Sequence, residues 1–291
     1  MTIINTNTAA LRANNASASA NKSLSTAMER LSTGKRINSA KDDAAGLAIT
    51  NSMTAQIRGM AQGIRNSNDG ISLAQTAEGA LDEVSNMLQR MRELTVQSSN
   101  GTYQSTDKTN IYAEQNALAD QIRSIVKNTQ FNGTTLFTGG AVAGTDKSVT
   151  IQTGANTADT VALKIGDLDN NDTAANALSK VVDFSATPNG MTGDSAAATP
   201  VVPALSDFDD AIKQVSTQRA NLGAAQNQLE SAVSNMTSNM TNLTDARSRI
   251  EDADFSTETT ALAKAQILNQ ASTAMLAQAN QSQQGVLKLL G

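Results

Sequence analysis

Apolar residues recur at helical spacing through both ends of the chain, and this pattern fails only in the middle. Over about 42–99 they follow steps of three, four and seven, so that they share one face of a helix. Such a heptad pattern predicts one long helix, and a shorter helix is predicted over about 105–129. The long seam consists of Met53, Ile57, Met60, Ile64, Ile71 and Ala74, then Ala77, Leu81, Val84, Leu88 and Met91.

The first predicted helix ends at Gly34, because glycine readily takes the left-handed conformation of a helix C-cap. Its thin apolar stripe contains Ile4, Leu11, Ala18, Leu24, Met28 and Leu31. Ser39 and Asp42 then form a weak capping box before the long helix, and Asp43 adds favourable negative charge.

Residues 205–291 return to helical spacing. One seam contains Leu222, Leu229, Val233, Met236, Met240, Leu243 and Ile250. Arg247 also falls on this seam, which indicates a break or a polar register point. Residues 252–256 are expected to end that helix and cap the next one. The last helix carries a second thin stripe of Leu268, Met275, Ala279, Val286 and Leu289.

The middle of the chain, about 136–204, is rich in Gly, Thr, Ala, Asp and Asn. Residues 148–152 and 160–165 alternate with period two, which predicts two strands or a hairpin. The three prolines lie at 188, 200 and 203, and we expect an exposed loop over 186–203. This zone is expected to be too small and too polar to hold much core.

The predicted fold class is therefore mainly α, a long antiparallel coiled coil or helical rod from both chain ends, with a small β-hairpin-containing insert. We expect terminal helices over 1–40 plus 252–291, a helical rod over 41–140 plus 205–251, and a solvent-facing insert over 141–204. The terminal stripes are too narrow to bury themselves in a lone helix pair, and short helices of this composition are marginal in water. Other copies of the chain are expected to cover them.

Composition narrows the function. The chain has no Cys and no His, which excludes thiol and imidazole chemistry and thiolate metal sites. Its net charge is −5, with no basic block for nucleic acid, and no apolar run approaches a membrane span. The first residues lack the features of a secretory signal peptide. We expect no enzyme activity, no cofactor and no metal.

Three short stretches suggest other chemistry at first sight. Residues 32–36 lack the upstream glycine and the final Ser or Thr of a phosphate-binding loop. The acidic residues at 42–43 and at 251–254 lack calcium-loop spacing, so helix capping is the preferred interpretation.

Several long motifs resemble bacterial flagellins. They are INTNTAALRANN, RLSTGKRINSAKDDAAGLAIT, RNSNDGISLAQTAEGALDEVSNMLQRMRELTVQSSNGT and TQFNGTTLF, followed near the C-terminus by SRIEDADFSTETTALAKAQILNQASTAMLAQANQSQQGVLKLLG. They occur in the family's order, over roughly residues 1–165 and 205–291, and IQTGANTADTVALKI is similar to the family's hairpin. Gln283 stands where many relatives have Pro.

The resemblance implies a subunit that polymerises into the extracellular flagellar filament for motility. It implies type III export without a cleaved leader, and terminal helices that are disordered in the free subunit and become ordered on assembly. The implied partners are other copies of the chain, an export chaperone on the C-terminal helix, a filament cap protein and a hook–filament junction protein.

The resemblance also implies that animal Toll-like receptor 5 recognises a helical face that packs against neighbouring subunits. The matching positions are Gln89, Arg90, Leu94, Gln97 and Glu114. Solvated charges on a helix are the simpler interpretation of the same residues. Filament-core packing is expected from Ile4, Leu11, Leu24, Met28, Leu31, Leu268, Met275, Ala279, Val286 and Leu289.

Two alternatives remain at this point. A hook–filament junction protein has similar helical ends but fills a single ring. A soluble binding protein or adhesin would hold a ligand in the insert, which has few aromatic residues.

Overall fold

The computed structural model describes residues 6–138, 146–169, 176–184, 191 and 203–288, with side chains as far as 282. The α-helices of this part are α1 (Thr8–Thr33), α2 (Ala44–Ser98), α3 (Ser105–Asn128), α4 (Leu205–Glu251) and α5 (Phe255–Lys288). The predicted mainly helical fold with a small strand-containing insert is therefore confirmed. The chain divides into two compact units, residues 1–57 with 241–291 and residues 58–240.

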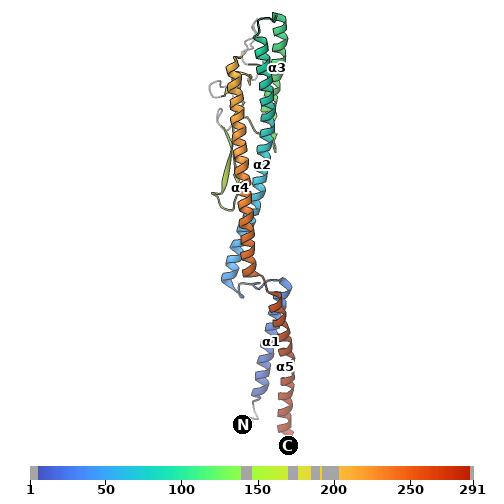
Figure 1. Cartoon of the computed structure of the whole chain (residues 1–291). Coiled ribbons are helices and arrows are strands. Elements are labelled where there is room, and N and C mark those ends of the chain that lie inside the picture. Colours follow the sequence, from blue (N-terminus) through green and yellow to red (C-terminus); the bar gives the residue numbers. More distant parts are fainter. Residues whose placement is uncertain (1–5, 139–145, 170–175, 185–190, 192–202, 289–291) are drawn as a thin grey trace. The chain divides into compact units, whose positions relative to one another are not determined.

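In the first unit α1 and α5 run side by side and antiparallel (Figure 1). The fully buried residues of α1 are Ala13, Ala20 and Ala27, and those of α5 are Ala265 and Ser272. Half-buried positions between them complete steps of three and four, as in a coiled coil. These seam positions are Ala10, Ser17, Leu24 and Leu31 in α1, and Leu262, Asn269, Leu276 and Ala279 in α5.

The segment between α1 and α2 begins at the C-cap of α1 and ends at the N-cap of α2. Gly34 adopts φ 71°, which confirms the predicted left-handed C-cap of α1. The predicted capping box at Ser39 is wrong, because α2 begins later. Asp42 instead closes a turn by accepting from the Ser39 N–H at 2.9 Å. Asp43 caps α2, since its Oδ1 accepts from the Gly46 N–H at 2.9 Å.

In the second unit, α3 and the neighbouring parts of α2 and α4 lie side by side (Figure 1). Polar contacts join α2 to α4, with Arg219 2.9 Å from Asp82 and Arg92 2.7 Å from Asp209. Between them lies the main core, which includes the predicted seam residues Ala77, Leu81, Val84, Leu88 and Met91. Leu222, Leu229 and Met236 of the predicted α4 seam are also buried.

The insert contains the predicted antiparallel hairpin, β3 (Lys147–Gln152) and β4 (Thr160–Ile165), paired from Lys147–Ile165 to Gln152–Thr160. A smaller hairpin joins β1 (Gln130–Phe131) to β2 (Thr134–Thr135) through Asn132 and Gly133, both at positive φ. This is the type I′ geometry favoured by an Asn-Gly pair.

The expectation that the insert holds little core is wrong. Its buried apolar side chains belong to the same hydrophobic core as those of α2, α3 and α4. They are Leu163, Ile165, Leu168, Leu178, Val181, Val182, Phe184 and Met191, with Leu178 on the 3₁₀ helix η1 (Ala177–Lys180). The predicted loop over 186–203 falls almost entirely outside the described residues.

The β3–β4 hairpin reaches α2 at a glycine. A Cβ at Gly63 would lie 2.3 Å from the Thr153 carbonyl oxygen, so only glycine permits this approach. Asn66, almost one turn further along α2, donates to the Gln152 carbonyl at 3.0 Å. The hairpin is therefore seated on α2 by close backbone packing and a hydrogen bond.

Candidate interaction surfaces

The α1–α5 pair has only small side chains at its most buried positions and leaves several large apolar side chains exposed. Leu11 and Met28 of α1 are 57% and 56% exposed, and Ile267, Leu268 and Met275 of α5 are 65%, 47% and 66% exposed. A few exposed apolar residues are ordinary, but here they belong to helices whose own seam buries mostly alanine. The unit therefore carries unburied apolar surface that the two helices cannot cover for each other.

The predicted packing residues fall on different sides of this pair. Leu11, Met28, Leu268 and Met275 are exposed, whereas Leu24, Leu31 and Ala279 are half-buried at seam positions. Ile4 and Leu289 lie outside the described residues, and so does the side chain of Val286.

Two exposed apolar residues of α5 were missed by the sequence interpretation. Ile267 lies beside the predicted stripe, and Phe255, the first residue of α5, is 68% exposed. Because neither falls on a heptad seam, periodicity gave no signal. Ile267 could have been found from the adjacent Leu268, because two large apolar residues in one helical turn cannot both lie on a narrow seam.

A charged face joins α2 to α3 in the second unit. Arg90 Nε and Nη2 donate to Glu114 Oε1 at 3.1 and 3.0 Å, and Arg90 Nη1 donates to Glu93 Oε2 at 3.3 Å. The hydrogen bonds to Glu114, and then to Glu93, raise the pKa of Arg90 above its ordinary value. All three side chains are about half exposed or more, so the group is a surface network.

The other three residues predicted for this face are Gln89, Leu94 and Gln97, and only the two glutamines lie at the surface. Gln89 and Gln97 are exposed, and Gln97 donates to the Tyr103 hydroxyl at 3.3 Å. Leu94 is only 2% exposed, so its side chain belongs to the core and cannot present a surface. Beneath the face lies Gln115, whose Nε2 donates to the Met91 carbonyl and to Thr95 Oγ1.

The described residues offer little to a small ligand or a metal. A shallow groove of about 430 Å³ between α1 and α5 is lined by Ser19, Lys22, Ser23, Thr26, Arg30 and Glu258 among others. In the described ranges no three acidic side chains are close enough together to hold a metal ion. Asp254 caps α5, accepting from the Ser256 N–H at 2.9 Å and from Thr257 Oγ1 at 2.8 Å.

These features define a class of helical proteins whose two chain ends pair and whose apolar surface is left for a partner. Comparison with known families agrees. Residues 4–141 match the bacterial flagellin N-terminal helical region, and residues 205–290 match the bacterial flagellin C-terminal helical region.

Relatives span the whole chain. It is 45% identical over 304 residues to a flagellin of Bacillus subtilis and 45% identical over 289 residues to a flagellin of Halalkalibacterium halodurans, covering 99% of both chains in each case. Among solved structures, a protein described as flagellar hook-associated, from Vibrio parahaemolyticus, matches with TM-score 0.57 and 17% identity. That match covers 72% of this chain and all of that one, and it concerns the fold alone.

The chain therefore belongs to the bacterial flagellin family. It is a structural subunit of the flagellar filament, which lies outside the cell. Among the described residues no helix combines the length and the hydropathy that crossing a membrane requires.

Proposed function

We propose that the chain polymerises by burying the outer apolar residues of α1 and α5 against neighbouring copies. The observation that carries this proposal is that the most buried seam positions hold only Ala or Ser, while large apolar side chains of the same two helices are about half exposed or more. Each large apolar side chain contributes about 1.5–3 kcal/mol when it becomes fully buried. The outer residues therefore hold most of the stabilisation that this pair can gain.

Within this proposal each predicted packing residue keeps a role. Leu11, Met28, Leu268 and Met275 contact neighbouring copies, while Leu24, Leu31 and Ala279 support the seam. Ile4, Val286 and Leu289 also pack in the filament core. The layers are residues 1–40 with 252–291 at the filament core, 41–140 with 205–251 around it, and 141–204 facing solvent.

The subunit is exported unfolded by the flagellar type III apparatus and orders on assembly. What supports this is the marginal stability of two helices that share an alanine seam, since such helices gain order mainly from neighbours. An export chaperone covers α5 beforehand, because its large apolar residues are exposed until then. A cap protein and a hook–filament junction protein complete the set of partners.

The face around Arg90 also binds animal Toll-like receptor 5. An exposed guanidinium held by two carboxylates presents its planar donors in a fixed orientation, which is typical of interface hot spots. Gln89, Gln97 and Glu114 contribute at the surface, and Leu94 holds the helix backbone in place from the core.

The experiment is seeded growth. Heat-dissociated chain is added to filament fragments, and elongation is followed by electron microscopy. The full chain is compared with a chain ending at Gln266 and with the full chain carrying Met275→Asp. The matched control is Gln278→Asp, which places the same charge at an exposed polar position of α5.

We expect the full chain and the control to elongate and the other two to stop. Growth of the Met275→Asp chain at the control rate would remove this residue from the packing surface. A full chain that stays folded but never elongates would contradict polymerisation and favour the hook–filament junction role.

A further inference from the structure

The fully buried positions of the seam between α1 and α5 repeat every seven residues. They are Ala13, Ala20 and Ala27 in α1, and Ala265 and Ser272 in α5. If α5 slides by seven residues along α1, small buried residues again meet the same kind of surface. These fully buried positions by themselves therefore discriminate poorly between registers, whereas the half-buried seam positions Leu262, Asn269 and Leu276 differ in size and polarity.

Three polar contacts mark the register that the structure adopts. Asn7 Nδ2 donates to the Ala279 carbonyl at 3.2 Å, Asn269 donates to Asn21, and Arg30 Nη1 lies 3.4 Å from Glu258 Oε1. The first two involve uncharged amides at exposed or half-buried positions, each of which contributes little by itself. The third is an ion pair whose Glu258 side chain is 12% exposed, so it favours the observed register from within the helix pair. A further constraint on the register comes from another part of the unit.

That constraint lies where the chain leaves α1 and enters α5. The segment after α1 and the end of α4 are joined by backbone hydrogen bonds, from the Arg36 N–H to the Glu251 carbonyl at 2.6 Å and from the Ala253 N–H to the Gly34 carbonyl at 3.0 Å. Lys35 and Asp252 form an antiparallel β-bridge. We call residues 34–36 and 250–253 the clasp.

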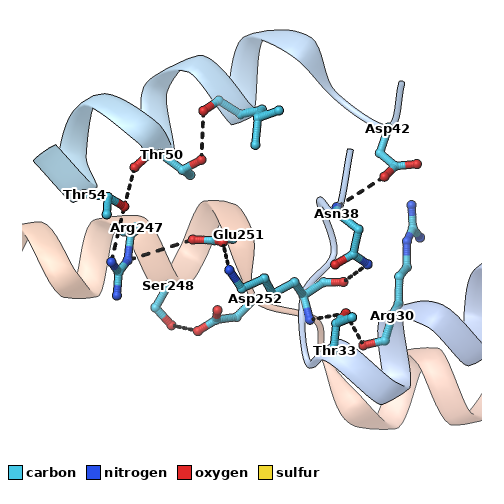
Figure 2. A network of polar contacts seen from close by, with 12 residues as sticks. Arg30, Thr33, Asn38, Asp42, Thr50, Thr54, Arg247, Ser248, Glu251 and Asp252 are labelled. Atoms are coloured by element: carbon cyan, nitrogen blue, oxygen red, sulfur yellow. Dashed lines mark hydrogen bonds and ion pairs between the residues drawn. The ribbon is translucent and has the colours of Figure 1, made fainter. Parts of the chain in front are cut away.

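Side chains reinforce the clasp, and Glu251 lies at its centre (Figure 2). Glu251 Oε1 pairs with Lys35 Nζ, and Glu251 Oε2 lies 3.9 Å from Arg247 Nε. Arg247 in turn donates to Thr54 Oγ1 on α2 at 3.3 Å. The Glu251 side chain is only 15% exposed, so these charges are less screened than a surface pair.

Arg36 adds a contact to the end of α4. Its Nη2 donates to the Ile250 carbonyl at 2.7 Å, and a cation is favourable at a helix C-terminus. The start of the α1–α5 pair is thus fixed by residues that belong to neither helix.

We propose that Glu251 is the positioning residue that sets the register of the α1–α5 pair, through Lys35 on one side and Arg247 on the other. The register decides which outer apolar residues of the two helices lie beside each other. The clasp therefore acts before any contact between copies, and only its consequence for filament growth rests on the proposed function.

The test uses the absence of native cysteine. The pair Asn21→Cys and Asn269→Cys reports the observed register, because these side chains are in contact. The pair Asn21→Cys and Leu276→Cys reports a slip of seven residues, about 10.5 Å along the helix and outside disulfide reach in the observed register. Both pairs are placed in the full chain and oxidised briefly with copper phenanthroline, with and without filament seeds.

Each cysteine pair is then combined with Glu251→Gln or Lys35→Met. Lys35 is about half exposed, so its replacement tests the same ion pair without burying a new polar group. Asp82→Asn is the control, because it breaks the ion pair to Arg219 in the other unit. Non-reducing gels give the slipped cross-link as a fraction of the observed one.

We expect this fraction to rise about five- to tenfold in Glu251→Gln and in Lys35→Met, an effect between those expected for an exposed ion pair and for a fully buried one. The control should leave it unchanged. An unchanged fraction in both variants, or an equal rise in the control, overturns the proposal. So does loss of both cross-links with helicity retained, because the clasp would then be needed for pairing itself.

Filament growth is scored separately. Failure to elongate with the observed register intact counts against the proposed polymerisation surface and not against the clasp.

Discussion

Arg90 on α2 and Glu114 on α3 are joined by two hydrogen bonds to a single carboxylate oxygen. The geometry orients the guanidinium although it is about half exposed. An exposed pair of this kind contributes little to folding, so its residues can change without loss of the fold. That separation makes the proposed receptor face testable by substitution.

Arg90→Ala is expected to reduce Toll-like receptor 5 signalling by about tenfold or more, the loss typical of an interface hot spot. The melting temperature should stay the same. A dose titration on reporter cells measures the effect. Arg92→Ala is the matched control, because Arg92 is similarly exposed and similarly paired, with Asp209. Equal signalling by the two variants would contradict the assignment of Arg90.

Gly63→Ala is expected to destabilise the 58–240 unit by about 1–3 kcal/mol, the usual cost of forcing extra volume into a packed site. The reason is that the added Cβ would lie 2.3 Å from the Thr153 carbonyl oxygen, a backbone atom that cannot move aside cheaply. Gly79→Ala is the control in the same helix, where a Cβ has open space. It should stabilise the chain by about 1 kcal/mol. Denaturant unfolding measures both, and destabilisation by Gly79→Ala would undermine the argument.

Gln115→Leu is expected to leave stability unchanged or to raise it by about 1 kcal/mol. Gln115 is fully buried, and its Oε1 has no hydrogen-bond partner within the described part of the chain. Leucine removes that unpaired oxygen, while Thr95 still donates to the Met91 carbonyl at 2.9 Å. Gln115→Ala leaves a cavity and should cost about 2–3 kcal/mol. A large loss in the leucine variant would show that the amide stabilises the fold.

Acid should loosen the start of α5. The hydrogen bond from the Thr257 side chain, followed by those from backbone N–H groups, lowers the pKa of Asp254 below its ordinary value of 3.8. A carboxyl group whose pKa is lowered by folding stabilises the fold at pH values above 3.8. This contribution is lost as the pH falls through the pKa of the folded state. Asp254→Asn keeps a capping oxygen but cannot titrate.

Circular dichroism measures helicity as the pH falls from about 5 to about 2, an interval that includes the ordinary pKa of an aspartate. The helicity of Asp254→Asn should depend less on pH than that of the unchanged chain. Identical curves would rule out this carboxyl as a contributor.

Helix positions were largely predictable from the sequence, because α2 and α3 begin and end within two residues of the predicted limits. Heptad spacing and the C-cap glycine Gly34 are local signals, and local signals determine where helices begin and end. The core contribution of the insert was not predictable in this way. Leu163 and Phe184 are buried by helices distant in sequence, a long-range effect that composition does not report.

The surfaces were only partly predictable for the same reason. Seam spacing located Leu24 and Leu31, yet the structure places alanines at the most buried positions and leaves Met28 exposed. Arg247 on the α4 seam was expected to mark a break or a polar register point, and it contacts Thr54 and Glu251. Which partner a polar seam residue meets depends on the fold around it.

The repeating small-residue seam also makes the length of the α1–α5 pair adjustable. Removing seven residues from each helix would shorten the pair by two turns, about 10.5 Å, and would keep Ala or Ser at every fully buried position. The length of the pair can thus change during evolution or design in whole repeats, with new side chains needed only at the half-buried seam positions.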